Sequence, residues 1–348
     1  MKPAPVHFQS SNIVNIFRAF VVLSLVFAGL FSLHAQPVNV QQFQNTQQAQ
    51  QLQTPLPSLM ASTNAPELYA GESTDVGPQH ILRMKPRPEY FNVWFDSQVF
   101  YSDNANFAQG KYILDSTVYV NTVQAAFVSP DFKVGEGKFS LTGGGISQWY
   151  NYGNHNMSSL DFNAQTLFTS SRYSWNNWQF SLGFSYTRLL DQEHYDQTYQ
   201  EYLPVLAVQR IFPINEKLLL VVGNQVDYHF SDVPASSIIT TNGTTGSTEI
   251  NNRFDDITSL VVSWQITRHL ILQPSYRFQY SNYRYSTDQT SDRNDYLNSF
   301  GITLAYYINQ NVSLRTFFNY NIKQSDDALT PAYHEYNGGL GGTLNFSF

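Results

Sequence analysis

The sequence predicts an all-β protein, an antiparallel up-and-down β-barrel that crosses a membrane, most simply with 12 strands. Three observations predict this fold class. Apolar and polar residues alternate along most of the chain after residue 88. Aromatic residues make up 16% of the 348 residues, while charged residues make up only 13%. An uncharged apolar segment near the N-terminus also indicates export through a membrane.

The composition narrows the classes of function. A soluble chain of this size carries about 25% charged residues, and the mean hydropathy of −0.31 argues against a helical membrane protein. The chain has no cysteine, which excludes disulfides, thiolate metal sites, a cysteine nucleophile and a lipidated N-terminal cysteine. The formal net charge of −7 disfavours nucleic acid as a partner.

The N-terminus resembles a secretory signal in its charge and length. The uncharged segment AFVVLSLVFAGLFSL spans residues 19–33 and follows Arg18. This segment is short for a membrane-spanning helix, which needs roughly 20 apolar residues. Ala35 stands directly before the expected cleavage site. Residues 1–35 are therefore predicted to be a signal peptide, with an uncleaved membrane anchor as the alternative.

The following segment, residues 36–88, is rich in Gln, Pro, Ala and Ser and shows no apolar periodicity. Such a stretch cannot bury enough apolar surface to offset the entropy of ordering. It is predicted to be a mostly disordered low-complexity linker that lies in the periplasm.

Residues 89–348 alternate with period two, the pattern of half-buried strands. Apolar faces of about 9–11 residues match tilted strands that cross a bilayer. Strands are predicted at residues 90–102, 116–128, 137–150, 158–169, 175–188, 199–211, 216–230, 256–267, 269–283, 295–308, 311–324 and 335–348. The second, third and sixth alternate weakly, so ten or fourteen strands are the alternatives. In the fourth, Leu160, Phe162, Ala164 and Phe168 are expected to face lipid and Asp161 the interior.

The alternative fold is a large soluble β-sandwich or solenoid. The outer faces of a sandwich would carry many Lys and Glu residues, which are scarce in this sequence. Short and long connections also alternate along the predicted strands. Short turns belong to the periplasmic end of a bacterial barrel and long loops to the outside. With an even number of strands, the C-terminus and the N-terminal segment are expected in the periplasm.

The final strand, LGGTLNFSF, places Leu344, Phe346 and Phe348 on one face and ends on an aromatic residue. On these residues the chain resembles the bacterial outer-membrane β-barrel proteins, and the resemblance covers residues 89–348 and the export signal. It implies that Leu344, Phe346 and Phe348 form a signal for the barrel-assembly machinery. It also implies outer-membrane lipid and lipopolysaccharide as partners, and it is compatible with a homo-oligomer.

The strongest candidates for chemistry are Asp227 and His229, which share the inward face of one predicted strand. The pair resembles the Asp–His pair of the omptin proteases, a family that also needs a second acidic pair across its cleft. Asp255 and Asp256 are near in sequence but begin the next strand. A hydrogen-bonded interior histidine is the simpler interpretation, so no catalytic residue, metal site or cofactor is expected.

The inward faces contain polar residues of both charge signs. The candidates for lining the lumen are Asp96, Asp161, Gln179, Lys217, Gln225, Asp227, His229, Arg277, Gln279, Arg315, Asn319 and Lys323. Twelve strands lie between the filled eight-stranded barrels and the open porins of sixteen or more. The leading hypothesis is a narrow porin-like channel for passive diffusion of small hydrophilic solutes or ions. The alternatives are a structural or adhesive barrel with a closed lumen and binding loops, and an omptin-like surface protease using Asp227 and His229.

Overall fold

The computed structural model describes residues 39–47, 50, 90–232, 251–284, 292–327, 330 and 332–348. The expected signal peptide at residues 1–35 lies outside these residues, as do most of the expected linker and most of the longest loop, 233–250. Within the described residues, no helix combines the length and apolar character needed to span a membrane.

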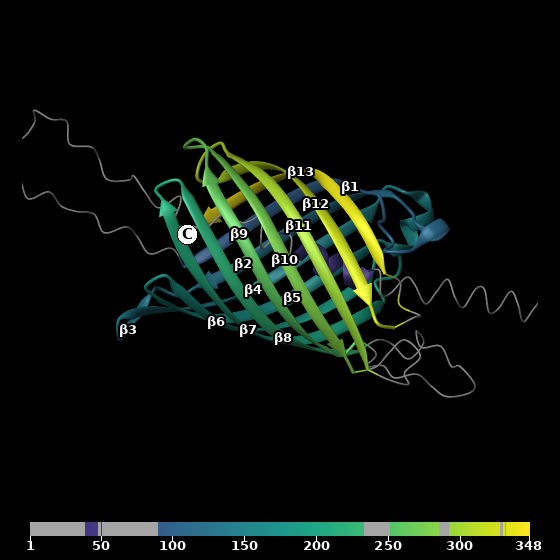
Figure 1. Cartoon of the computed structure of the whole chain (residues 1–348), viewed down its shortest axis with the longest axis horizontal. Coiled ribbons are helices and arrows are strands. Elements are labelled where there is room, and N and C mark those ends of the chain that lie inside the picture. Colours follow the sequence, from purple (N-terminus) through teal and green to yellow (C-terminus); the bar gives the residue numbers. More distant parts are fainter. Residues whose placement is uncertain are drawn as a thin grey trace, which may run out of the picture.

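One antiparallel sheet closes on itself to form the barrel (Figure 1). The strands are β1 (Phe91–Ser102), β2 (Ser116–Val128), β3 (Phe132–Val134), β4 (Gly137–Tyr152), β5 (Phe162–Trp175), β6 (Trp178–Asp191), β7 (Gln197–Asn215), β8 (Leu218–Asp232), β9 (Arg253–Gln265), β10 (Leu270–Tyr283), β11 (Arg293–Tyr307), β12 (Val312–Ser325) and β13 (Tyr333–Ser347). The short strand β3 pairs only with β4. The other twelve close the ring through the β1–β13 and β2–β4 pairings, which confirms the predicted twelve-stranded barrel.

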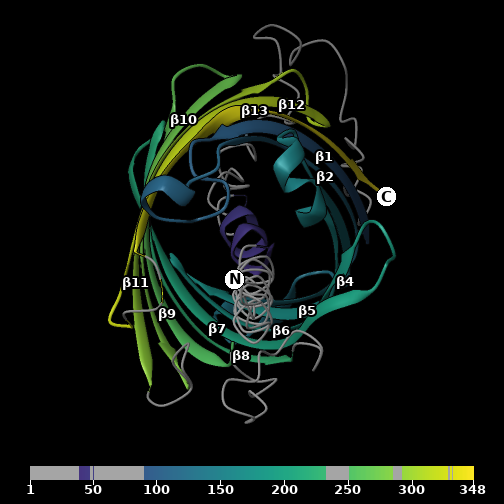
Figure 2. The same cartoon turned by 90° about the vertical axis from the view of Figure 1, so that its right-hand side faces the viewer.

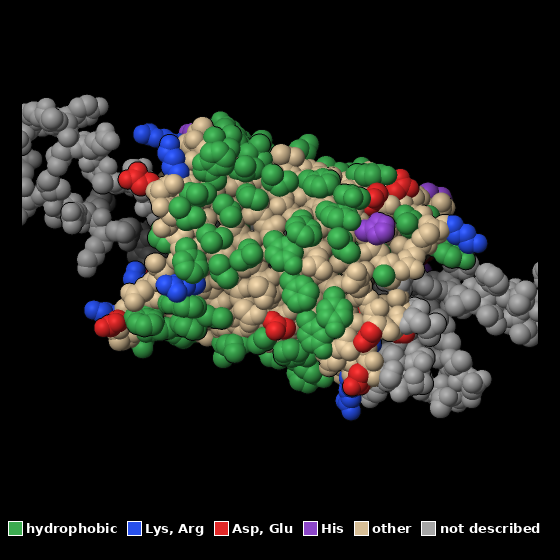
Figure 3. Space-filling view, in the orientation of Figure 1, with side chains coloured by type: hydrophobic (Ala, Val, Ile, Leu, Met, Phe, Trp, Pro, Cys, Tyr) green, Lys and Arg blue, Asp and Glu red, His purple; other side chains and the backbone are tan. Residues whose placement is uncertain are grey.

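The outer surface carries the apolar face of most strands. Figure 3 shows hydrophobic side chains over the middle of one face, with charged side chains gathered mainly toward the two ends. Exposed large apolar residues include Phe95, Leu182, Phe184, Leu206, Phe230, Phe300, Leu314, Phe318 and Leu340. A water-soluble monomer rarely exposes so continuous an apolar surface. Hydrocarbon must therefore cover this surface, and closure of the sheet leaves no unpaired strand edge within it.

The two ends of the barrel differ in their connections. The strand pairs β5–β6, β7–β8, β9–β10 and β11–β12 are joined by short turns at one end. The C-terminal residues lie at that end, because the amide of Asn345 donates to the carbonyl oxygen of Asn311 in the β11–β12 turn at 2.8 Å. The opposite end carries the 3₁₀ helices η1 (Gly110–Tyr112) and η2 (His155–Leu160) and the long loops.

The fourth predicted strand differs from the observed one. Residues 158–160 belong to η2, and β5 begins at Phe162. Phe162 and Ala164 are buried, whereas Leu167, on the opposite face, is 65% exposed. The expectation that Leu160, Phe162, Ala164 and Phe168 face lipid was therefore wrong, because the parity of Phe162 and Ala164 faces the interior and that of Leu167 faces outward.

Residues 39–47 form a helix inside the ring of strands, drawn in purple in Figure 2. Gln41 and Gln44 reach Tyr333 and Arg253, the first residues of β13 and β9, at the end that carries the long loops. Gln50 contacts Gln148, further inside on β4. The sequence predicted a periplasmic linker here. The structure instead places these residues in the lumen, with the helix N-terminus toward the long loops.

Candidate functional site

The candidate site is the inner wall of the barrel, which carries most of its charged residues along β1 and β7–β13. On β1, Asp96 receives two hydrogen bonds from Arg315 of β12, at 2.5 and 2.8 Å. Arg315 also donates to Gln98 at 3.0 Å. On β11, Asp295 contacts Lys323 at 2.9 Å and Arg293 at 3.3 Å. Opposite charges thus neutralise one another around this part of the wall.

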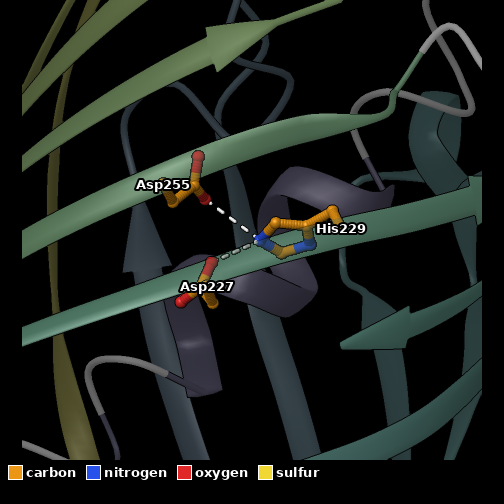
Figure 4. Close-up of side chains that lie close together, drawn as sticks. All are labelled: Asp227, His229 and Asp255. Atoms are coloured by element: carbon orange, nitrogen blue, oxygen red, sulfur yellow. Dashed lines mark ion pairs between the residues drawn. The ribbon is translucent and has the colours of Figure 1, made fainter. Parts of the chain in front are cut away.

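A compact charged cluster lies where β7, β8 and β9 run side by side. His229 Nδ1 is 2.8 Å from Glu201, and its Nε2 is 3.1 Å from Asp227 and 3.0 Å from Asp255. Figure 4 shows the two contacts of Nε2. Arg253 Nε lies 3.0 Å from both carboxylate oxygens of Asp255. All five side chains are buried, so the three acids and two bases compensate one another away from water.

Asp227, His229 and Asp255 bring three ligand atoms close enough to hold a metal ion. The position is already taken by a cationic side chain, because Arg253 places one guanidinium nitrogen 3.1 Å from His229 Nε2 and another on Asp255. A divalent cation would have to displace this positive group. The donor set therefore fits an internal ion-pair network better than a metal centre.

The same geometry bears on the protease hypothesis. A general base needs an imidazole nitrogen that reaches the substrate or its attacking water. In this cluster both nitrogens of His229 already face carboxylates. Asp255 stands on the neighbouring strand, paired with Asp227 in the register, rather than across a cleft. Asp256 points to the outer face, where it accepts from Asn224 at 2.7 Å.

The opposite side of the lumen is aromatic. Tyr150 of β4 stacks on Phe162 of β5, with ring centroids 4.3 Å apart and planes 8° apart. Phe43 of the helix packs its edge against Tyr150 at 6.5 Å. Val118 and Val120 of β2 belong to the same buried cluster. Here the inward face carries a cluster of apolar side chains beside polar ones such as Gln148, and Phe43 of the helix packs against this cluster.

A cavity lies between the helix and the wall formed by β1 and β10–β13. It is lined mainly by neutral amides and hydroxyls, together with Arg277, Glu335 and the ring pair Phe100–Phe317. Glu335 accepts from Ser102 at 2.7 Å and from Asn321 at 2.9 Å. Arg277 donates to Ser299 at 3.1 Å. The cavity can thus offer donors and acceptors to a small polar molecule.

The remaining candidates from the sequence occupy two kinds of position. Gln179, Gln225, Gln279, Asn319 and Lys323 all stand on strands and bond to polar residues of the inner wall, namely Gln209, Asp227, Asp255, Asn337 and Asp295. Asp161 is instead the C-cap of η2, where it accepts from the amide of Tyr152 at 2.8 Å. Lys217 lies in the turn before β8 and is exposed. Neither Asp161 nor Lys217 belongs to a strand wall.

Sequence reasoning missed Glu201, Arg253 and Glu335 as interior residues. Arg253 was overlooked because the predicted strand began at residue 256, three residues too late. Glu201 belongs to a weakly alternating strand, but its parity with Ala207 and Gln209 could have placed it inside. Phe43 carried no usable signal, since a single aromatic residue in a glutamine-rich segment does not indicate a partner.

No protein-family model and no curated protein sequence matches the chain. Several solved structures resemble it. An outer-membrane channel from Pseudomonas putida F1 is 10% identical, with a TM-score of 0.50, over 78% of this chain and all of that chain. The NanC porin is 10% identical, with a TM-score of 0.41, over 72% of this chain and 98% of that chain. The β domain of the Bordetella autotransporter BrkA is 11% identical, with a TM-score of 0.44, over 75% of this chain and all of that chain.

At these identities the likeness to the Pseudomonas channel shows the fold alone. Together with the closed sheet and the apolar exterior, it defines the class of this protein. The chain is a closed twelve-stranded β-barrel with an apolar exterior, and its fold is similar to that of an outer-membrane channel.

Proposed function

We propose that the protein is a narrow porin-like channel for passive diffusion of small hydrophilic solutes or ions across the outer membrane. The observation that carries this proposal is the polar inner wall of a closed barrel, in which residues of both charge signs face the lumen from β1 and β7–β13. Polar side chains on the inner wall can replace the water contacts of a hydrophilic solute that enters the lumen.

Conductance in a planar bilayer tests the proposal. Purified full-length protein should give discrete current steps in concentrated KCl. A folded protein that gives no steps in any variant, including those described below, would contradict the channel.

The paired charges of the wall set the expected selectivity. Opposite charges across a narrow lumen create a transverse field that selects by polarity as well as by sign. Asp96→Asn removes one acid but leaves Arg315 in place, so the reversal potential in a KCl gradient should shift toward chloride. Ser97→Ala, at an exposed neighbouring position, is the control and should leave the potential unchanged.

We further propose that the end with short turns and the C-terminus faces the periplasm, and that the long loops face the outside with the surrounding lipopolysaccharide. The alternation of short and long connections supports this orientation. Cysteines introduced at Gln109 in the η1 loop and at Asn176 in the β5–β6 turn would report it. In intact cells, an impermeant maleimide should label the first and spare the second.

The terminal residues support assembly through the barrel-assembly machinery. Leu344, Phe346 and Phe348 are exposed on the lipid-facing side. Deleting Phe348 removes only the last residue of the chain, yet it should lower the amount of heat-modifiable barrel in outer-membrane fractions. Unchanged amounts would remove this role from the terminal phenylalanine.

A barrel with a closed lumen is the second candidate, and the helix at residues 39–47 favours it. This helix occupies the space through which solutes would pass. The two candidates are reconciled if the helix can leave.

A further inference from the structure

The inner wall contains a receptor surface for the N-terminal helix. Phe43 is 1% exposed and Val40 is 5% exposed, and both belong to the cluster that contains Val118, Val120 and Tyr150. In a water-filled lumen these wall residues would be exposed to solvent at a cost of about 25 cal/mol per Å² of apolar area. Phe43 and Val40 shield these apolar wall residues from water, which removes this cost.

Polar contacts hold the helix on its other sides. Arg253 donates to Gln44 at 2.8 Å, Gln148 donates to Gln50 at 3.2 Å, and Gln41 donates to the hydroxyl of Tyr333. These wall residues come from β9, β4 and β13, so the helix is bound from three sides of the barrel. Contacts to three separate strands indicate that the helix is bound at a defined position in the lumen.

The contacts that hold the helix are nevertheless individually weak, so the helix can undock. Residues 39–50, with the sequence NVQQFQNTQQAQ, carry no charge, so no ion pair joins the helix to the charged cluster beside it. A neutral hydrogen bond contributes only about 0.5–1.5 kcal/mol net. Among the described residues, Asn39 Oδ1, Gln42 Oε1 and Gln44 Nε2 have no protein hydrogen-bond partner despite their burial. These groups regain hydrogen bonds with water when the helix leaves, which lowers the net cost of undocking.

We propose that the lumen wall is a binding site for the protein's own residues 39–47 and Gln50, and that this part of the chain is a reversible plug that closes the channel. The inference rests on the proposed channel function. Phe43 is its apolar anchor, and the amides of Gln41, Gln44 and Gln50 set its position. With the plug docked, the route along the polar wall is blocked. With the plug released, Arg253, Gln148, Tyr333 and the lining of the adjacent cavity face the passing solute.

Cross-linking tests the plug directly, since the chain has no cysteine of its own. The variant Gln50→Cys with Gln148→Cys places thiols at two side chains that already touch. A short bis-methanethiosulfonate reagent should join them and abolish current steps in a planar bilayer, and dithiothreitol should restore the steps. The matched control pairs Gln50→Cys with Trp149→Cys, whose position faces outward, and should not cross-link.

A second variant opens the plug instead of locking it. Phe43→Asp puts a charge into the apolar cluster, which disfavours docking. The ratio of open to closed time should rise by at least about tenfold over the full-length protein. Gln47→Asp adds the same charge at a half-buried helix position and should change the ratio by less than about twofold, because it does not anchor the helix.

The outcomes separate the plug from the channel. Equal conductance before and after cross-linking, with the cross-link verified by mass, would overturn the plug and leave the channel standing. A folded Phe43→Asp barrel that shows no current would overturn the channel itself. If the cross-linked form gives no current steps and Phe43→Asp does give them, both the plug and the channel are supported.

Discussion

The two sides of the lumen are both built from the inward-facing alternate residues of their strands, yet they differ in polarity. Along β8 and β9 the inward residues include Asp227, His229, Arg253 and Asp255, which form a buried ionic network. Along β2, β4 and β5 the inward residues include Val120, Tyr150 and Phe162, which form an apolar cluster. Strand parity sets which residues face inward, but it does not set their polarity. The helix of residues 39–47 lies between the two sides and matches both.

The difference has a physical cause. An inward position next to a filled space can be apolar, because the filling group covers it, whereas an inward position next to water must be polar or paired. Phe43 covers the aromatic side at Tyr150. On the ionic side, Gln44 is the one residue of the described helix that bonds to the charged cluster, so charges there are balanced within the wall itself.

The largest effect is expected on the ionic side. Asp255→Ala removes the carboxylate that binds Arg253 Nε and one of the three carboxylates around His229, so two buried cationic groups lose a close partner. The free energy of unfolding should fall by about 3–5 kcal/mol, as is typical when one partner of a buried pair is lost. Urea unfolding in detergent micelles, followed by tryptophan fluorescence, measures it.

Asp256→Ala is the matched control, since the neighbouring residue faces outward and is only half-buried. It loses one hydrogen bond from Asn224 and should cost less than about 1.5 kcal/mol. Equal decreases in the free energy of unfolding for the two variants would show that the inner network contributes no more to stability than an outward-facing hydrogen bond.

On the aromatic side, Tyr150→Ala should cost about 3 kcal/mol, because it removes the stack on Phe162 and leaves a cavity beside Phe43. The same urea titration detects the loss. Tyr150→Phe keeps the ring and should retain most of the stability. A large loss in Tyr150→Phe would instead assign the role to the hydroxyl group rather than to ring packing.

A smaller effect should distinguish the two faces of β5. Leu167→Arg puts a charge on a residue that is 65% exposed toward lipid, which costs about 2 kcal/mol at intermediate depth. Ser170→Arg, on the inward face, should cost less because its long side chain can reach the lumen. The reverse order would restore the original assignment of this strand.

The smallest effect is expected outside the lumen. Lys138 and Asp131, near the β3–β4 hairpin, lie 3.8 Å apart with side chains 71% and 57% exposed. Lys138→Ala should change the free energy of unfolding by less than about 0.5 kcal/mol, because solvent screens such pairs. A loss as large as that of Asp255→Ala would mean that burial does not govern the strength of these charges.

Much of the fold was predictable because β structure has a local period. Alternation placed β2 at residues 116–128, as observed, and gave the correct faces for β6, β8, β10, β12 and β13. The prediction failed for β5, where alternation was present but the apolar parity faced inward. Local sequence shows that two faces differ; it does not show which of them meets lipid.

The site was less predictable than the fold. Asp227 and His229 were placed inside from parity alone. Their partners Glu201 and Arg253 come from neighbouring strands, 28 and 24 residues away in sequence. Lys217 and Asp161 were assigned to the lumen, but they lie in a turn and at a helix cap, because strand ends cannot be read to within a few residues.

The sequence by itself was enough to predict a membrane-spanning barrel with an export signal. Period-two alternation and a low content of charged residues can be recognised without knowing which residues meet in the fold. Only the tertiary structure decided the partners of His229, the inward turn of Phe162 and the place of residues 39–47. The physical reason is that each of these depends on which strands the closed ring brings together. A glutamine-rich segment has no amphipathic period of its own, and it acquires a defined position only against a wall that supplies Tyr150 on one side and Arg253 on the other.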